Sequence, residues 1–393
     1  HASIAPELAN VRHQIANLRK RISHLSDEHE AMVMNTADKP RKTHILNRGQ
    51  YDQPGAEVTP GVPSSLPQPA AELPANRLGL ARWLVAPDHP LTSRVAVNRI
   101  WQMLFGRGLV ETSADFGAQG ELPTHPQLLD WLACEFIETG WDVKQLVKLL
   151  VMSATYQQSS TTSPTKLTAD PYNQLYSRGP RFRLAAEFVR DSVLQVSGTL
   201  VSRIGGPSVR PYQPPNLWRE VSHFGSTPAT AQVFVGDHGE RLYRRSMYTY
   251  WKRTVPPPSM VSFDAPNRET CTVQRARTNT PLQALVLLND PQFLEASRNF
   301  AERIMLANTE TNARIRFAYD QALARPPSEA ELAIVRRTLR RELVRFRDDP
   351  TAAQAYLQYG EATRHADLSI EEHAAWTSVA SLIFNLSEMI TKG

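Results

Sequence analysis

The sequence predicts a mainly α-helical protein, a multi-helix globular domain with an N-terminal coiled-coil-like arm and a few short strands. Apolar residues recur at helical spacing over most of the 393 residues. Capping residues precede several of these stretches, and strand-like composition is confined to short segments. With 41% hydrophobic residues, 21% charged residues and seven tryptophans to bury, the chain is expected to be globular rather than disordered.

The first element is an arm of residues 1–39. It contains apolar side chains spaced alternately three and four residues apart: Leu8, Val11, Ile15, Leu18, Ile22 and Leu25. This spacing places them along one side of a helix, as in a short coiled coil. Because the seam weakens beyond residue 25, we expect a helical hairpin or a docking arm rather than a long coiled coil.

A proline-rich connector is expected at residues 40–75. Seven prolines and the lack of periodicity indicate an extended segment between the arm and the rest of the chain. Within it, residues 44–49 are expected to form one short strand followed by a turn.

Residues 76–393 are expected to form a helical domain, either as one body or as two subdomains of residues 76–206 and 207–393. Its first part contains four stretches of helical periodicity, at residues 78–85, 95–105, 128–137 and 143–156. Thr92 and Ser93 can cap the second helix, and Pro126 suits the first turn of the third. Gly106 and Gly140 suit helix ends.

The first part closes with a helix over residues 184–204, which we expect to end at Gly205-Gly206. Residues 246–251, rich in Tyr, Thr and Trp, are the best strand candidate in the chain. Helices then resume. Three sequence signatures mark where they begin: Thr280-Pro281, Asp290-Pro291 and the capping box Ser328-x-x-Glu331. A break is expected near Pro350.

Composition and motifs exclude several classes of function. The net charge of +5 is spread over a large surface, so we expect no nucleic-acid partner. No apolar run approaches the ~20 residues needed to span a bilayer. Cys134 and Cys271 belong to no C-x-x-C-H haem motif, and the histidines form no H-E-x-x-H motif, so we expect neither a cofactor nor a metal in this chain.

The densest functional signal lies in residues 241–277. Residues 241–253 interleave five cations with four aromatic rings, a composition that can recognise anions, planar groups or sugars. If this segment is a strand, alternation places Tyr248, Tyr250 and Lys252 on one face. The candidate ligand-binding residues are Arg245, Tyr248, Tyr250, Lys252, Arg268 and Arg277. The alternative is a half-buried strand whose Arg and Lys stems lie along apolar surface.

Candidate catalytic groups are fewer. Asp264 and Glu269 flank Arg268 and form either an acid–base pair or a structural ion-pair network. Asp115 and His125, in an irregular loop between two predicted helices, are the carboxylate and imidazole that could converge with them.

One further arginine group precedes and enters the helix predicted at residues 184–204: Arg178, Arg181, Arg183 and Arg190. It either binds an anionic ligand or, at Arg190, pairs with Asp191.

Motifs in a fixed order suggest a family. They are NRLGLARWL at 76–84, NRIWQMLFG at 98–106, DFG at 115–117, HPQLLDWL at 125–132, GWDV at 140–143, SATY at 153–156, RSMY at 245–248, FDAPNRETC at 263–271 and TNTPLQAL at 278–285. Over residues 46–385 the chain resembles the C-terminal domain of unknown function 1553 of large planctomycete-type proteins associated with cytochrome c modules.

The resemblance implies an exported protein in the periplasm or at the cell surface, with residues 1–39 as the linker from an upstream domain. It implies upstream domains of the same protein as partners, and haem on an upstream module only. Proteins of this kind occur in organisms that degrade sulfated polysaccharides. The expected function is therefore a binding or scaffold domain for a partner module or an anionic saccharide. The alternative is a hydrolase or lyase acting on an extracytoplasmic glycan. The resemblance carries no catalytic residues and names no reaction.

Overall fold

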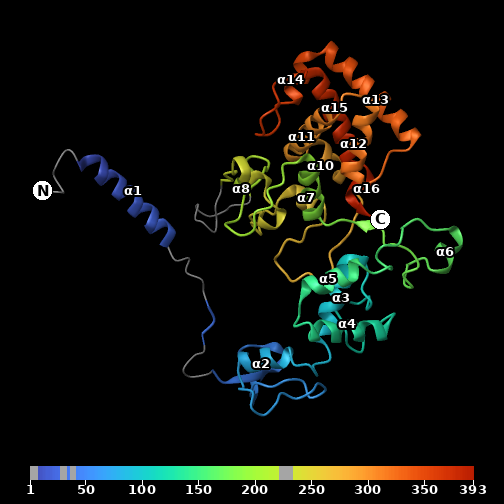
Figure 1. The fold of residues 1–393 in the computed structure, drawn as a ribbon. Helices are drawn as coiled ribbons and strands as arrows, with labels where there is room; N and C mark the ends of the chain where they lie inside the picture. The colour runs from blue at the N-terminus through green and yellow to red at the C-terminus, as the bar shows by residue number, and fades with distance from the viewer. Residues whose placement is uncertain (1–7, 27–32, 36–40, 221–232) are drawn as a thin grey trace. The chain divides into compact units, whose positions relative to one another are not determined.

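The computed structural model describes residues 8–26, 33–35, 41–220 and 233–393 (Figure 1). The chain divides into two compact units, residues 1–83 and 84–393. The predicted fold class is confirmed, since α-helices dominate the described residues and strands form two small antiparallel sheets. None of the described helices is both long and apolar enough to cross a membrane.

Unit 1 contains helix α1 (Ala9–Ser26) and a small sheet. Strand β1 (Thr43–Leu46) pairs antiparallel with β2 (Pro54–Val58), and the 3-10 turn η2 (Asn47–Gly49) follows β1. The predicted short strand and turn at residues 44–49 are thus confirmed. Most of helix α2 (Arg77–Leu84) belongs to this unit, and Trp83 is held there by a 2.7 Å hydrogen bond from its Nε1 to the Pro67 carbonyl.

Unit 2 begins with three helices that correspond to three of the predicted stretches: α3 (Thr92–Phe105), α4 (Pro126–Glu138) and α5 (Val143–Val151). They enclose a core in which Trp101 stacks on Phe105 with ring centroids 4.0 Å apart. Gly106 ends α3 in the left-handed conformation (φ 81°), as predicted. Helix α5 ends five residues earlier than predicted.

The predicted cap of α3 is wrong. Thr92 and Ser93 lie inside the first turn, where their own backbone N–H groups need acceptors. The buried ring of His89 supplies one, because its Nδ1 accepts from the backbone nitrogens of Leu91 and Thr92, each at 3.3 Å.

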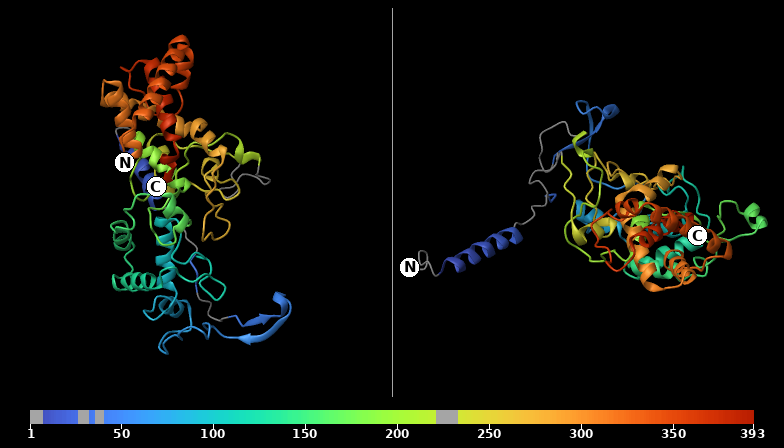
Figure 2. Two further views of the ribbon diagram at one scale, coloured as in Figure 1. Left: turned by 90° about the vertical axis from the view of Figure 1, so that its right-hand side faces the viewer. Right: turned by 90° about the horizontal axis from the view of Figure 1, so that it is seen from above.

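The rest of unit 2 is mostly helical. Its elements are α6 (Pro164–Ala169), β3 (Phe182–Arg183), α7 (Ala186–Ser197), α8 (Leu217–Glu220), η3 (Gly239–Tyr243), η4 (Ser246–Tyr248), α9 (Pro258–Val261), α10 (Pro281–Asn289), α11 (Pro291–Ala307), α12 (Thr311–Leu323), α13 (Glu329–Asp348), α14 (Pro350–Tyr356), α15 (Ile370–Phe384), α16 (Ser387–Ile390) and β4 (Thr391–Lys392). Figure 2 shows the orange and red C-terminal helices gathered at one end of this unit. In their core Phe300 of α11 stacks on Phe384 of α15 at 5.3 Å.

Most helix boundaries in this part follow the local sequence. Pro281 and Pro291 occupy first turns, and Asp290 caps α11 by accepting from the Gln292 nitrogen at 2.9 Å. The capping box of Ser328 and Glu331 is present at the start of α13. The exception is α7, which stops at Ser197 rather than near residue 204, because Gly198 turns left-handed (φ 80°).

The predicted strand at residues 246–251 is also wrong. Ser246–Tyr248 forms the 3-10 turn η4, and the residues after it make only isolated bridges. Side chains of α7 fix the backbone where this segment begins. The buried Arg190 donates to the carbonyls of Leu242 and Arg244, each at 2.7 Å, while Asp191 accepts from the nitrogen and hydroxyl of Ser246. Asp191 thus uses the amide of Ser246, the first residue of the predicted strand, and Arg190 fixes the backbone just before it.

Candidate functional site

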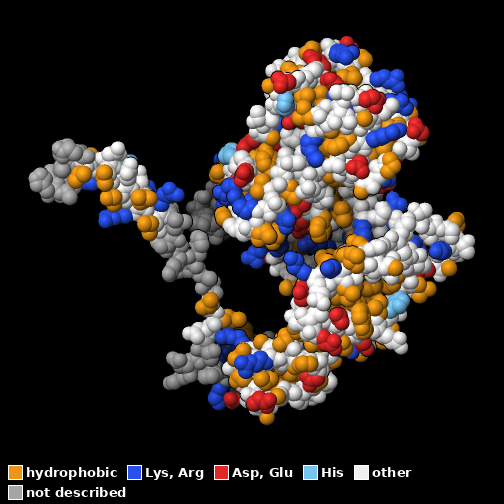
Figure 3. Space-filling view, in the orientation of Figure 1, with side chains coloured by type: hydrophobic (Ala, Val, Ile, Leu, Met, Phe, Trp, Pro, Cys, Tyr) orange, Lys and Arg blue, Asp and Glu red, His pale blue; other side chains and the backbone are white. Residues whose placement is uncertain are grey.

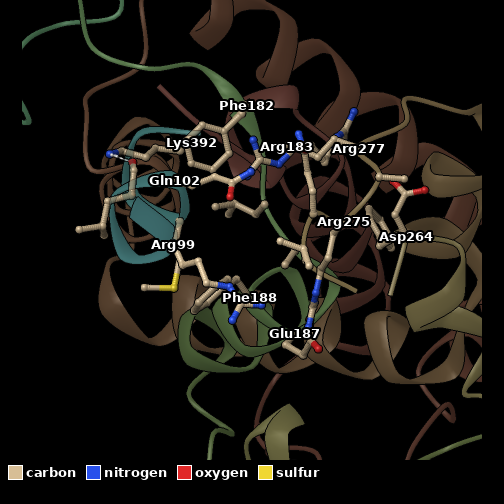
Figure 4. A pocket seen from close by; sticks show the side chains of 18 of the residues that line it. Arg99, Gln102, Phe182, Arg183, Glu187, Phe188, Asp264, Arg275, Arg277 and Lys392 are labelled. Carbon is tan, nitrogen blue, oxygen red and sulfur yellow. Dashed lines mark hydrogen bonds and ion pairs between the residues drawn. The ribbon is translucent and has the colours of Figure 1, made fainter. Parts of the chain in front are cut away.

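A cavity of about 1100 Å³ in unit 2 is the main candidate site (Figure 4). Its walls come from α3, from β3 and the start of α7, from residues 263–264, from the loop of residues 273–277, and from Lys392 of β4. Five cationic side chains line it: Arg99, Arg183, Arg275, Arg277 and Lys392. Two carboxylates do so as well, Glu187 and Asp264. Figure 3 shows basic side chains around the hollow between α7 and α3.

The pairing of β3 with β4 brings two of these cations to the cavity. Phe182 lies opposite Lys392, and Arg183 lies opposite Thr391, in an antiparallel register. The Lys392 ammonium is fixed by a 3.0 Å hydrogen bond to the Leu104 carbonyl and lies 3.3 Å from the centre of the Tyr156 ring. The end of β4 is therefore tied to the end of α3.

Arg183 and Arg277 are held by backbone and side-chain acceptors rather than by carboxylates. Arg183 donates through Nη2 to Asn279 at 2.6 Å, while its Nη1 is shielded from solvent and has no hydrogen-bond partner among the described residues. Arg277 donates to the Gly106 carbonyl at 2.8 Å and covers the Phe182 ring at 4.3 Å. Burial lowers the pKa of both guanidinium groups, opposed at Arg183 by the charge of Asp264.

The two carboxylates of the cavity are already engaged. Glu187 accepts from Arg275 at 2.7 Å. Burial is the largest influence on the pKa of Glu187 and raises it, but the hydrogen bond from Arg275, a backbone hydrogen bond and the nearby positive charges together outweigh burial. The pKa is therefore lowered, and this carboxylate is ionised at neutral pH. Asp264 accepts from the nitrogen of Thr278 at 2.7 Å and from its hydroxyl at 2.9 Å.

Arg99 differs from the other cations. It lies on the exposed side of α3 and makes no hydrogen bond or ion pair within the part of the chain that the structure describes. In Figure 4 its guanidinium points into the cavity across from Arg275. The guanidinium of Arg99 is therefore available to bind an anion that enters the cavity.

The six predicted ligand-binding residues do not gather at this cavity; only Arg277 lines it. Arg245 is exposed at the start of η4. Tyr248 lies under the buried Arg244 at 3.9 Å, and its hydroxyl accepts from the nitrogen of Gly205.

The other three candidates lie against tryptophans. Tyr250 and Lys252 both contact Trp218, with Tyr250 5.9 Å from it ring to ring and the Lys252 ammonium 4.7 Å from the ring centre. Arg268 covers Trp251 at 4.2 Å. These contacts occupy faces that the sequence suggested were open to a ligand.

Of the four predicted catalytic residues, only Asp264 lines the cavity. Glu269 lies 3.7 Å from Arg253, both largely exposed. Asp115 accepts from the nitrogen of Gly117 at 2.7 Å and so organises its own loop. The His125 Nδ1 lies 3.0 Å from the Thr124 hydroxyl.

Sequence reasoning missed most of the cations of the cavity because they are dispersed from Arg99 to Lys392 and belong to no compact motif. One feature of the sequence did indicate cations of the cavity: the group of arginines that precedes and enters α7. It contained Arg183, but its last member, Arg190, is buried and structural. No group of three His, Cys, Asp or Glu side chains that could hold a metal ion occurs among the described residues.

Comparison with known proteins places the chain in a family. The model of the family described as "PSD1: Protein of unknown function (DUF1553)" matches residues 76–339, which is 264 of the 393 residues. A search of curated proteins and a search of solved structures found no match. The match agrees with the resemblance carried by the ordered motifs and includes most of the cavity. The chain belongs to the PSD1 family of proteins of unknown function (DUF1553).

Proposed function

We propose that this domain binds an anionic saccharide, with the cavity lined by Arg99, Arg183, Arg275, Arg277 and Lys392 as its site. The observation that carries the proposal is the imbalance of charge in one cavity. Five cations face two carboxylates, and both carboxylates are already held by Arg275 and Thr278. Partly buried cations are stabilised by an anion that replaces lost hydration.

The size and the apolar lining suit a sugar ring better than a bare inorganic anion. The cavity of about 1100 Å³ has room for more than one pyranose ring. Phe188 and Met103 line it with 55% and 50% of their surface exposed, so each offers apolar area to the carbon face of a sugar. The arginines would then select sulfate or carboxylate substituents.

Calorimetric titration of the chain with a sulfated oligosaccharide and with its desulfated counterpart tests this proposal. We expect binding of the sulfated form only, weakened at high salt because the contacts are charged. Arg99→Gln is the cleanest variant, since Arg99 supports no other part of the fold. It should weaken binding about tenfold, the equivalent of one charge-assisted hydrogen bond.

Arg245→Gln is the matched control, because it removes another exposed arginine, one outside the cavity. It should leave the affinity unchanged. Loss of binding in Tyr250→Ala with Lys252→Ala, together with unchanged binding in Arg99→Gln, would move the site to the Trp218 surface and contradict the proposal.

A second candidate function is a hydrolase or lyase acting on an extracytoplasmic glycan. The observation in its favour is that Asp264 and Glu187 share the cavity. Against it, Glu187 has a lowered pKa and so cannot act as the protonated acid that glycoside hydrolysis requires. Release of new reducing ends from a sulfated polysaccharide, abolished in Asp264→Asn, would favour this function over binding alone.

We also propose that the domain works in the periplasm or at the cell surface, next to a haem-bearing cytochrome c module of the same protein, as a partner or scaffold. The support is the resemblance of the ordered motifs. Sedimentation of the purified chain mixed with such a module tests the association. If the two components sediment independently at every ratio, the scaffold role is excluded.

A further inference from the structure

Helix α1 (Ala9–Ser26) carries an apolar seam on its surface. The side chains of Leu8, Val11, Ile15, Leu18 and Ile22 are 39–61% exposed, although each is large and apolar. We propose that α1 is a docking helix for an acidic partner helix, with which it forms a short two-stranded coiled coil. This inference is independent of the ligand proposed for the cavity.

The spacing of the seam fits one partner helix. Intervals of three and four residues give an average of 3.5, which keeps apolar side chains facing a single neighbour. In heptad terms Leu8, Ile15 and Ile22 occupy a positions, and Val11 and Leu18 occupy d positions. The heptad from Ile15 to Ile22 has isoleucine at a and leucine at d. Isoleucine at a with leucine at d favours two strands over three or four.

The charges beside the seam identify the partner as acidic. Arg19 and Arg21 take the e and g positions on either side of Leu18, and Lys20 lies between them on the outer face. Helix α1 contains no Asp or Glu at all. A partner with Glu at its own e and g positions would form interhelical ion pairs with these arginines.

Two other occupants fit less well. A second copy of α1 would place arginines along both flanks of the pair, because α1 has no acidic side chain to offer them. A membrane surface favours a broad apolar face with Trp or Phe, whereas the seam of α1 is one residue row wide and α1 has no Trp, Phe or Tyr.

Two synthetic heptad peptides with the same Ile and Leu core are the probes, one with Glu and one with Lys at all e and g positions. Fluorescence anisotropy with the full chain should show binding of the Glu peptide only, weaker at high salt. Ile15→Gln with Leu18→Gln should weaken binding at least about tenfold, since two core positions are lost while glutamine keeps helix propensity.

Asn10→Gln with Asn17→Gln is the matched control, because it introduces the same residue twice on α1 but away from the seam. It should bind the Glu peptide as the parent chain does. Arg19→Glu with Arg21→Glu should reverse the preference, so that the Lys peptide binds at least about tenfold better than the Glu peptide. Oligosaccharide binding in the cavity should be unchanged in all three variants.

The proposal is overturned if the parent chain binds neither peptide, or binds both equally. It is also overturned in favour of a second copy if the chain dimerises in analytical ultracentrifugation and the seam variant does not. Binding of phosphatidylglycerol vesicles through α1, without binding of the Glu peptide, would identify a membrane surface instead.

Discussion

Replacement of Gly360 by alanine should destabilise unit 2 strongly, because it disturbs a buried carboxylate. Gly360 lies between α14 and α15 with φ +86°, and a Cβ there would meet the side chain of Glu295 far inside van der Waals distance. Glu295 is 1% exposed and accepts from the Tyr243 hydroxyl at 2.8 Å and from the Ala362 nitrogen at 2.6 Å. Burial and the hydrogen bond to Glu295 together raise the pKa of Tyr243.

The expected magnitude has two parts. A left-handed backbone costs an alanine about 1–2 kcal/mol relative to glycine. Moving Glu295 aside also weakens two hydrogen bonds to a buried charged acceptor, each worth about 1.5–3 kcal/mol. Allowing for partial relaxation, Gly360→Ala should reduce the free energy of unfolding by about 3–5 kcal/mol, a large share of the ~5–15 kcal/mol typical of a domain.

Urea unfolding followed by circular dichroism measures this change. Gly205→Ala is the matched control, since Gly205 has φ +81° but no atom within 4 Å of the added Cβ. It should cost only the backbone part, about 1–2 kcal/mol. If the two variants lose equal stability, the close packing of Gly360 against Glu295 contributes nothing and the reasoning is refuted.

Three further predictions concern single side chains. Burial raises the pKa of Asp290 to about 6, above its value in the unfolded chain. Ionisation of Asp290 therefore lowers the stability of the folded protein as the pH rises from ~4 to ~6. Asp290→Asn should raise Tm at pH 7 and leave it unchanged at pH 4. The hydrogen bond from Arg325 lowers the pKa of Glu331 to about 2, so Glu331→Gln should cost about 1 kcal/mol in urea unfolding at pH 7. This cost should shrink as the pH falls towards 2, where the carboxylate of the parent is about half protonated. The side chain of the fully buried Asn98 forms hydrogen bonds with both the nitrogen and the carbonyl of Val110. Asn98→Ala should lower the free energy of unfolding by about 2–4 kcal/mol, measured by thermal unfolding. An unchanged Tm would show that water replaces both hydrogen bonds.

Local signals placed most helix boundaries correctly. The capping box of Ser328 and Glu331, the cap and proline at 290–291, and the glycine after α3 each act within one helical turn. Such signals depend only on neighbours in the chain, so they can be recognised without a tertiary structure. The cap of α3 differs from the prediction because His89, which precedes the helix, accepts from the nitrogens of Leu91 and Thr92.

Long-range contacts explain the errors at the functional segment. Residues 246–251 have the composition of a strand, but Asp191, 55 residues before Ser246, accepts from the nitrogen and hydroxyl of Ser246. Arg190 fixes the carbonyls of Leu242 and Arg244 just before the segment. The spacing of residues within the segment cannot indicate contacts from side chains of α7. Other contacts make Arg244 and Tyr248 structural rather than open to a ligand, since Arg244 covers the Tyr248 ring and donates to the Arg203 carbonyl.

Sequence alone therefore established the helical class, most helix starts and the family, because these depend on spacing and on short ordered motifs. The cavity is a product of tertiary structure. It joins Arg99 of α3, Arg183 of β3, the loop carrying Arg275 and Arg277, and Lys392 at the end of the chain. Charges so far apart in sequence come together only after the strands and helices have packed, and the unpaired positive charge that suggests an anionic ligand exists only in the folded protein.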